Sequence, residues 1–209
     1  WHFSATEGEE YLGEFWLKLI GSHNVSNALA VIACARRLGI DVEAIRTALA
    51  SFEGTARRFE YKGKLTNGVT IVDDYGHHPS EIKATLKAAR AFYPYKNIRL
   101  IFQPHTFSRT KALLLDFAQS FNEADEVIII DTYSSARESR GEITSVELVN
   151  EIKNYHAKVV YKPTIIEAAD YLAQTTNRSD LIITMGAGDV WQVGDKLIEK
   201  FGLITGSEF

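Results

Sequence analysis

The sequence FEYKGKLTNGVTIVDDYGHHPSEI, residues 59–82, decides the fold class of this chain. It contains two strand-like stretches on either side of Asn67-Gly68, and an Asn-Gly pair in that position is the strongest short signal for a β-hairpin. Pro79 follows soon after, and proline is favoured at the first position of an α-helix. We therefore predict a hairpin at the edge of a sheet, with its second strand leading directly into a helix.

Beyond residue 82, helical patterns alternate with short apolar stretches. Strands are predicted at 98–102, 127–131, 158–161 and 181–184, and helices over 79–92, over 106–122, after the capping-box pairs Thr144/Glu147 and Thr164/Glu167, and after residue 190. This alternation is typical of a parallel sheet that carries helices on both faces. We predict an α/β domain with a doubly wound, mostly parallel sheet.

The pattern of residues 1–56 differs, and we interpret this part as a separate unit. Its predicted elements are one or two strands in residues 1–20, a helix over 24–38 closed by Gly39, and a helix capped by Asp41 with Ile45, Leu49 and Phe52 buried. Gly54 breaks the last pattern, so we place the domain boundary at residues 54–58. Because the chain begins with Trp1, we interpret it as a piece of a longer polypeptide, in which the final GSEF (206–209) could derive from cloning.

The composition excludes several classes of protein. With 209 residues, a net charge of −4 and a pI near 5.9, the chain lacks the basic balance that nucleic acids or membrane surfaces favour in a partner. No secretory signal is visible, and no apolar run approaches the roughly 20 residues that span a bilayer. Cys34 is the single cysteine, which fits a reducing cytosol, and its helical surroundings predict a buried structural thiol. We expect a cytoplasmic protein.

Polar side chains follow several predicted strands at the point where each strand ends. Asp73 and Asp74 follow one strand, 103–105 and Asp131 follow two others, and 186–189 follows the last. In open α/β sheets, ligands bind at the carboxyl ends of the strands. The sequence therefore predicts a ligand site at this edge of the sheet.

The acidic and basic residues around the hairpin each have two interpretations. Asp74 could accept hydrogen bonds from ribose hydroxyls, while Asp73 caps the turn. Arg57 and Arg58 follow the Gly54 break, and a guanidinium there could bind a phosphate in bidentate fashion. The alternative is a solvated or salt-bridged arginine pair.

Two amides lie near the start of the first predicted helix. Asn24 and Asn27 are three residues apart and therefore share a helix face. A carboxamide can donate to and accept from one edge of adenine at the same time. In the alternative interpretation, Asn24 is only a helix N-cap and Asn27 is a surface residue.

Three histidines could suggest a metal, but His77, His78 and His105 have no companion cysteine or acidic residue at a usual ligand spacing, and adjacent histidines point in different directions. We expect no intrinsic metal site, and contacts to a phosphate or carboxylate fit better. Arg109 lies one turn after His105 in the first turn of a helix, where a cation and a helix N-terminus attract anions. A plain surface arginine is the alternative.

The segment MGAGDV (185–190) matches G-x-G, but Trp191 occupies the third glycine position of a dinucleotide fingerprint, so a tight turn is favoured. The polar loop 132–144 is interpreted as a flexible surface loop or a movable lid. The chain contains no G-x-x-x-x-G-K-[ST] motif. If ATP is the ligand, its phosphate cradle comes from elsewhere.

Five motifs in order, spread over residues 21–190, resemble the Mur ligase family. They are GSHNVSNALA, FEGTARRFE, DDYGHHPSEI, FQPHTFSRT and MGAGDV. Within that family they are most similar to the enzymes that add L-alanine to UDP-N-acetylmuramate in peptidoglycan precursor synthesis. Each motif is modest, but their combination and order are specific.

The resemblance implies an ATP-dependent, amide-forming ligase that acts through an acyl phosphate and uses Mg²⁺. Residues 1–56 would be the end of the central ATP-binding domain, and 57–209 would be the carboxyl-terminal Rossmann-like ligase domain. The implied partners are UDP-N-acetylmuramate, L-alanine and the upstream domains of the same polypeptide. Most Mg²⁺ ligands and the P-loop would lie upstream, so the isolated fragment is expected to be inactive.

The resemblance also implies roles for single residues. Asn24 and Asn27 would contact adenine, Asp74 the ribose and Arg58 the phosphates. The acyl phosphate and the incoming alanine would face Tyr75, His77 or His78, His105 and Arg109, with Arg58, His77 and His78 as the implied catalytic residues. Either a histidine or the phosphate would accept the proton of the amine.

One departure from the family pattern is Thr106, which stands where the family often has arginine and places part of the alanine contact in doubt. Two related alternatives remain: a murein tripeptide recycling ligase of the same family, and a non-catalytic Rossmann-type nucleotide-binding module. The Tyr75-Gly76 pair and Phe102–His105 favour the alanine-adding enzymes over the recycling ligase. A third alternative is an interaction domain with an ordinary polar sheet edge.

Overall fold

The structure of the protein is a computed structural model, and it describes residues 1–134 and 143–204. These residues form two compact units, divided between Ala56 and Arg57. The loop predicted at 132–144 falls mostly outside the described residues, and the expectation for 206–209 falls wholly outside them. Within the described ranges, no helix is both long and apolar enough to cross a membrane.

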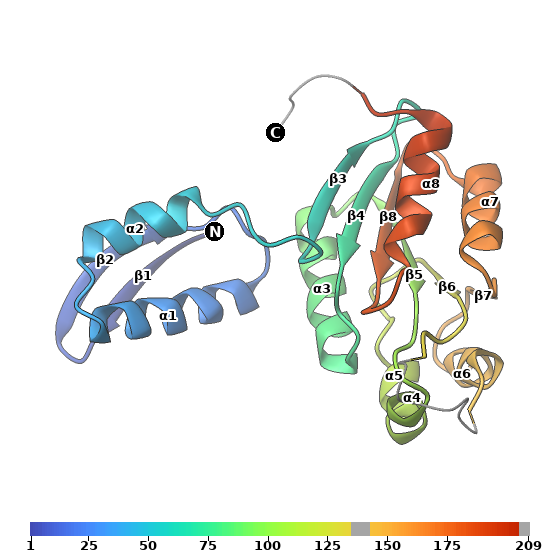
Figure 1. Ribbon diagram of the computed structural model, residues 1–209, viewed down its shortest axis with the longest axis horizontal. Coiled ribbons are helices and arrows are strands. Elements are labelled where there is room, and N and C mark those ends of the chain that lie inside the picture. Colours follow the sequence, from blue (N-terminus) through green and yellow to red (C-terminus); the bar gives the residue numbers. More distant parts are fainter. Residues whose placement is uncertain (135–142, 205–209) are drawn as a thin grey trace. The chain divides into compact units, whose positions relative to one another are not determined.

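The first unit packs two helices against an antiparallel hairpin (Figure 1). Its elements are β1 (His2–Glu7), β2 (Glu10–Trp16), α1 (Ser22–Arg37) and α2 (Val42–Ser51). Phe15, Ile32 and Leu49 belong to its buried core, so both helices contribute apolar side chains to the hairpin. The Asp41 carboxylate accepts from the main-chain N–H groups of the first turn of α2, which confirms the predicted cap.

Two expectations for this unit are wrong. Phe52 is the C-cap of α2 and is 43% exposed, because the helix ends before its apolar stripe reaches that residue. Cys34 is also exposed. The face of α1 that packs on the hairpin carries Ala28 and Ile32, and Cys34 does not lie on that stripe.

The second unit contains a six-stranded sheet in the order β3-β4-β8-β5-β6-β7. Its strands are β3 (Glu60–Lys64), β4 (Thr70–Asp74), β5 (Asn97–Phe102), β6 (Glu126–Ile129), β7 (Val159–Tyr161) and β8 (Asp180–Met185). All neighbours are parallel except the β3–β4 hairpin, which forms one edge as predicted. At its turn, Gly68 adopts φ 91°, a conformation that glycine reaches without steric cost. The doubly wound α/β prediction is confirmed.

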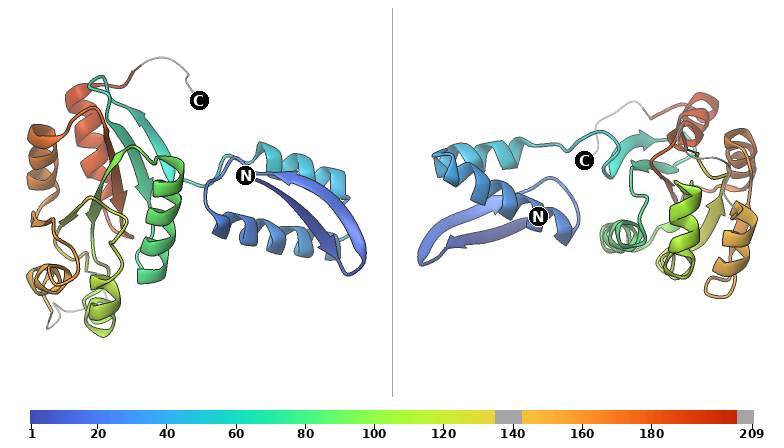
Figure 2. Two further views of the ribbon diagram at one scale, coloured as in Figure 1. Left: turned by 180° about the vertical axis from the view of Figure 1, so that it is seen from behind. Right: turned by 60° about the horizontal axis from the view of Figure 1, so that its bottom comes forward.

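Two layers of helices cover this sheet (Figures 1 and 2). On one face lie α3 (Pro79–Phe92), α4 (Phe107–Ala112), α5 (Leu114–Ala118) and α6 (Ser145–Ile152), and on the other lie α7 (Ile165–Thr175) and α8 (Trp191–Phe201). Buried Leu86, Phe117 and Leu148 belong to the core of the first face, and Leu172 and Leu197 to that of the second. Both predicted capping boxes, at the starts of α6 and α7, are present.

The prediction of one continuous helix over 106–122 is wrong. The segment forms two short helices that meet at Leu113, whose φ of −115° and ψ of 24° lie outside the helical region. Phe117 and Phe121 are nevertheless buried against the sheet. The apolar spacing therefore indicated the buried face correctly, although it gave no sign of the break.

Candidate functional site

The carboxyl ends of β4, β8 and β5 are side by side, because β8 lies between the other two strands. In the register of the sheet, Asp74 is opposite Met185, and Met185 is opposite Phe102. The polar residues that follow these strands therefore come together at one edge of the sheet. This edge holds every predicted site residue except the two asparagines of the first unit.

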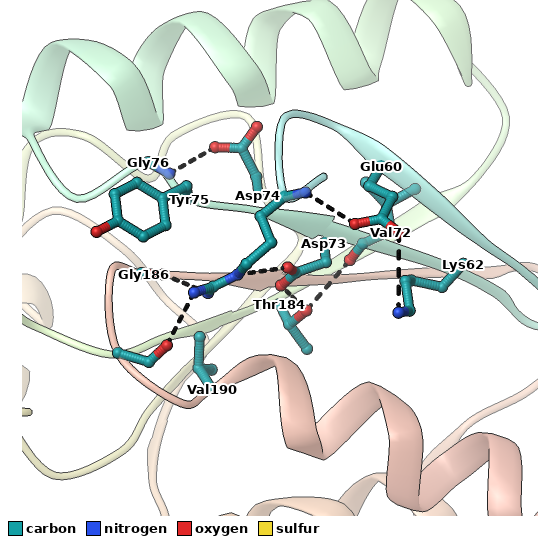
Figure 3. A network of polar contacts seen from close by, with 12 residues as sticks. Glu60, Lys62, Val72, Asp73, Asp74, Tyr75, Gly76, Thr184, Gly186 and Val190 are labelled. Atoms are coloured by element: carbon teal, nitrogen blue, oxygen red, sulfur yellow. Dashed lines mark hydrogen bonds and ion pairs between the residues drawn. The ribbon is translucent and has the colours of Figure 1, made fainter. Parts of the chain in front are cut away.

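The two aspartates at the end of β4 are both buried but have different partners (Figure 3). Asp73 accepts from the Arg57 guanidinium at 2.9 Å and from the Thr184 hydroxyl at 2.6 Å. Asp74 accepts from the main-chain N–H groups of Gly76 at 2.7 Å and Phe59 at 2.9 Å. The expectation that Asp73 caps the turn is therefore wrong, because Asp74 does so.

Burial raises the pKa of Asp74, and the two main-chain N–H donors and the nearby Arg58 offset only part of that effect. Asp74 is thus a desolvated carboxyl whose oxygens are both hydrogen-bonded. Each oxygen keeps further acceptor capacity, since a carboxylate has about four lone-pair sites.

Arg57 and Arg58 have contrasting environments. The Arg57 guanidinium donates to Asp73 and to the main-chain carbonyls of Gly186 at 2.6 Å and Gly188 at 3.0 Å. The Arg58 side chain is 54% exposed, and its nearest carboxylate, that of Glu81, is 3.9 Å away. Of the two guanidiniums, Arg58 is therefore the one that remains accessible to an anionic ligand.

The turn between β4 and α3 is fixed by Glu81. Its carboxylate accepts from the N–H groups of His77 at 2.8 Å and His78 at 3.0 Å, while the His78 ring accepts from Ser80 N–H, and together these bonds form a capping box. Burial alone would raise the pKa of Glu81, but the N–H donors and the charges of His77 and Arg58 lower it overall.

The His77 ring has a defined orientation. Its Nδ1 lies 3.0 Å from the carbonyl oxygen of Tyr75, which can only accept, so Nδ1 carries the proton of this hydrogen bond. In a neutral ring, Nε2 is then the basic nitrogen. His78 instead points its Nδ1 towards Ser80, 2.8 Å from the hydroxyl oxygen. The two adjacent histidines therefore have different roles in the turn.

A row of rings connects the turn to the end of β5. The His77 ring is 5.5 Å from the Tyr75 ring and 6.2 Å from the His105 ring, between centroids, and His105 is 5.8 Å from Tyr133. Arg109 donates to the carbonyl of His105 at 2.6 Å, which leaves other N–H groups of its guanidinium available. The structure thus brings Tyr75, His77, His105 and Arg109 together, as the sequence predicted.

The turn after β8 is held to the end of β5. The Gln103 side chain donates to Asp189 at 2.8 Å and accepts from the N–H of Val190 at 3.1 Å. A Cβ atom at Gly188 would collide with Gln103 and with the Tyr133 ring, at 2.6 Å from its nearest ring carbon. Glycine at 188 therefore allows a close approach, and 185–190 forms a braced turn of the kind favoured from the sequence.

The two asparagines lie in the first unit, at the start of α1. Gly21 is the N-cap of α1, so the interpretation of Asn24 as the cap is wrong. Asn24 donates to the carbonyl of Ile20 at 2.8 Å, and Asn27 donates to the Asn24 side-chain oxygen at 3.3 Å. The amides share one face of the helix, as their spacing predicts.

No metal site is complete in this part of the polypeptide. Among residues 1–134 and 143–204, no group of three or more His, Cys, Asp or Glu side chains is arranged to hold a metal ion. The described residues therefore do not fit an intrinsic Mg²⁺ site, and no chemical step is derived through one.

Sequence reasoning missed four residues of this edge: Arg57 as an anchor, Glu81, Gln103 and Tyr133. Glu81 had an available signal, because it lies three residues after His78 at the start of a helix. The others had none, since their contacts join segments that are distant in sequence.

Comparison with known families gives a match to the model described as "Mur ligase, glutamate ligase domain", over residues 57–188. Among curated proteins, the chain is 47% identical over 191 residues to a UDP-N-acetylmuramate–L-alanine ligase of Caldanaerobacter subterraneus subsp. tengcongensis. This alignment covers 91% of the chain and 41% of that protein. The chain thus spans about two fifths of the length of such relatives.

Two solved structures resemble the chain. A UDP-N-acetylmuramate-alanine ligase from Thermotoga maritima superposes with a TM-score of 0.76 and 29% identity, over 92% of this chain and 40% of that one. A murein peptide ligase from Psychrobacter arcticus gives a TM-score of 0.72 at 23% identity, over 99% and 43%. The second likeness concerns the fold alone.

Proposed function

Because the chain belongs to the Mur ligase family, we propose that it is the carboxyl-terminal part of an ATP-dependent ligase that joins L-alanine to UDP-N-acetylmuramate. Residues 1–56 would end the central ATP-binding domain, and 57–209 would be the ligase domain. Curated relatives at 46–47% identity over nine tenths of the chain carry that enzyme name. The proposal implies a role in peptidoglycan precursor synthesis in the cytoplasm.

The observation that carries this proposal is the set of side chains along one sheet edge. Exposed Arg58 lies beside Tyr75, and the row of rings continues to His105, next to Arg109. A cation at each end of a row of polar rings suits a ligand with separate anionic groups. The two substrates of the proposed second step, an acyl phosphate and an amino acid carboxylate, have such groups.

The proposed reaction has two steps. The carboxylate of UDP-N-acetylmuramate attacks the γ-phosphorus of ATP, and the bond to ADP breaks to give an acyl phosphate. The alanine amine then attacks the acyl carbon, and inorganic phosphate leaves as the amide forms. Arg58 would neutralise phosphate charge, and Mg²⁺, bound mainly by upstream residues, would add to that neutralisation.

The amine must lose a proton to complete the amide. The basic Nε2 of neutral His77 is one acceptor, and His78 is a second; phosphate oxygens are a third. Arg109 and His105, with Tyr75, would hold the alanine carboxylate and the acyl phosphate. For the nucleotide, Asn24 and Asn27 would contact adenine.

Asp74 would accept from the ribose hydroxyls with lone pairs that Gly76 and Phe59 do not use.

The test uses the full-length parent polypeptide with ATP, Mg²⁺, UDP-N-acetylmuramate and L-alanine. We expect phosphate release that requires all four, and formation of the alanyl product by mass spectrometry. Replacing alanine with the murein tripeptide, and UDP-N-acetylmuramate with free tripeptide acceptors, separates the recycling activity. Release with the tripeptide but not with alanine would overturn the proposal, and ATP binding without any release would favour a non-catalytic module.

A further inference from the structure

Arg58 lies between two residues with unusual backbone conformations. Arg57 has a φ of 60° and Phe59 a φ of 48°, and both values fall in the left-handed region that non-glycine residues rarely adopt. Such conformations cost free energy and persist only where the surrounding structure holds them in place. The contacts of this segment should therefore explain why the chain keeps two strained residues beside Arg58.

The main chain of 57–59 is fixed by three hydrogen bonds. Arg57 N–H donates to Glu60 at 2.8 Å, and the Arg57 carbonyl accepts from Tyr75 N–H at 2.6 Å. Phe59 N–H donates to Asp74 at 2.9 Å. Two of these partners belong to the end of β4 and the turn after it, so the segment is attached to the sheet edge.

The Arg57 side chain attaches the same segment to a second strand. Its guanidinium joins Asp73 near the end of β4 to the carbonyls of Gly186 and Gly188, which follow β8. Asp73 is in turn fixed by Thr184 of β8, as Figure 3 shows. Planar guanidinium donors in a fixed geometry hold such acceptors more rigidly than an ammonium group does.

Tyr75 connects the two arginines. Its ring lies 5.1 Å from the Arg57 guanidinium carbon and 5.5 Å from that of Arg58, both within the range of cation–π attraction. Arg57 is largely engaged by protein acceptors, whereas Arg58 is more than half exposed. The geometry thus separates an arginine that holds the framework from one that faces solvent.

We infer that Arg57 is a positioning residue, which fixes the backbone of 57–59 and the Tyr75 ring so that Arg58 is held ready for the phosphates of the nucleotide. The inference rests on the proposed role of Arg58 in that reaction. Arg57 itself contacts no substrate in this account. Its effect on nucleotide binding passes entirely through Arg58.

The chain offers a matched control for the test. Arg90 also donates to two main-chain carbonyls, those of Lys96 and Glu123, and to one carboxylate, that of Asp125. These acceptors precede β5 and β6, at the opposite edge of the sheet from the site. Arg57→Lys and Arg90→Lys therefore remove the same kinds of contact from the same unit, one at the site and one away from it.

The measurement is the Kd for ATP in the full-length parent, by calorimetry, together with the melting temperature. We expect Arg57→Lys to weaken ATP binding about tenfold and Arg90→Lys to leave it within twofold, at similar losses of thermal stability. In an Arg58→Ala background, Arg57→Lys should weaken ATP binding no further. Asp73→Asn, which removes one acceptor of Arg57, should reproduce the effect in part and replaces Arg57→Lys if that variant does not fold.

Unchanged ATP affinity in folded Arg57→Lys, or effects of Arg57→Lys and Arg58→Ala that simply multiply, would overturn the inference. The readout is independent of the proposed chemistry, because it needs no alanine and no turnover. If the wild-type parent binds ATP but releases no alanine-dependent phosphate, the proposed function fails, while the binding pattern of the variants still decides the role of Arg57.

Discussion

Asp73 and Asp74 are adjacent in the chain and equally hidden from solvent, yet they share no hydrogen-bond donor. Asp73 is paired with the guanidinium of Arg57, whereas Asp74 accepts from two main-chain N–H groups. A guanidinium carries a full charge and an N–H group only a partial one, so the cost of burying charge is less well offset at Asp74. This difference accounts for the raised pKa of Asp74.

The raised pKa of Asp74 predicts a pH-dependent stability. The folded chain keeps a proton on Asp74 at pH values where the unfolded chain, with a pKa of about 4, has lost it. The free energy of unfolding contributed by Asp74 therefore decreases as the pH rises from about 4 to the raised pKa, and is constant above that.

Asp74→Asn removes this titration. Urea unfolding of wild type and variant between pH 3 and 7 should give a stability difference that changes in that direction. Asp170→Asn, at an exposed position of α7, is the control and should give a flat difference. A wild-type advantage at Asp74 that grows with pH would contradict the account.

Glu81 should behave with the opposite sign. Its pKa is lowered overall in the folded state, so its stabilising effect is present above the ordinary glutamate value of about 4 and is lost as the pH falls through the lowered pKa. We expect Glu81→Gln to cost about 1 kcal/mol at pH 7, the scale of a lost helix cap, and less at pH 3.

Glu147→Gln provides the comparison, because Glu147 completes the same kind of capping box on α6 away from the site. Both variants should lose stability with the same pH trend, but only Glu81→Gln should weaken ATP binding by the full-length parent. Equal ATP affinities in the two variants would exclude a role for Glu81 in the site.

Gly188→Ala should destabilise the second unit by about 1–3 kcal/mol, the usual cost of overpacking a close contact. The added methyl group would collide with Gln103 and Tyr133. Gly194→Ala is the control: its methyl group would lie 3.1 Å from Ile71, and alanine gains helix propensity there, so we expect little change. Urea unfolding measures both, and adding Tyr133→Ala should restore part of the loss at 188.

Variants of the full-length parent should separate the nucleotide from the amino acid. Asn24→Ala and Asp74→Ala should raise the KM for ATP, whereas Arg109→Ala should raise the KM for alanine and leave the KM for ATP unchanged. Steady-state phosphate release measures these constants. If the KM for ATP is unchanged in both Asn24→Ala and Asp74→Ala, the nucleotide assignments are wrong.

Local signals in the sequence predicted local structure well. Asn67-Gly68 indicated the hairpin, and the threonine–glutamate pairs at 144/147 and 164/167 indicated two helix starts. Each signal acts within a few residues of itself, so it needs no knowledge of the fold. The site edge was also predictable, because parallel strands end on the same side of a sheet.

Contacts between distant segments were not predictable in this way. Nothing in the run Arg57-Arg58 indicates which guanidinium is engaged by protein and which is exposed, because the difference depends on Gly186 and Gly188, more than a hundred residues later. The exchange of expected roles between Asp73 and Asp74 has the same cause. The strand order likewise depends on pairing partners that local propensity does not encode.

The position of β8 has a consequence for synthesis on the ribosome. β8 is the last strand to be made, yet it lies between β4 and β5, which are made much earlier. Until residues 180–185 leave the exit tunnel, the nascent chain holds two sheet fragments with open edges and cannot join them. The second unit therefore completes its fold only near the end of translation, and a chain that terminates before β8 exposes pairing edges that favour aggregation.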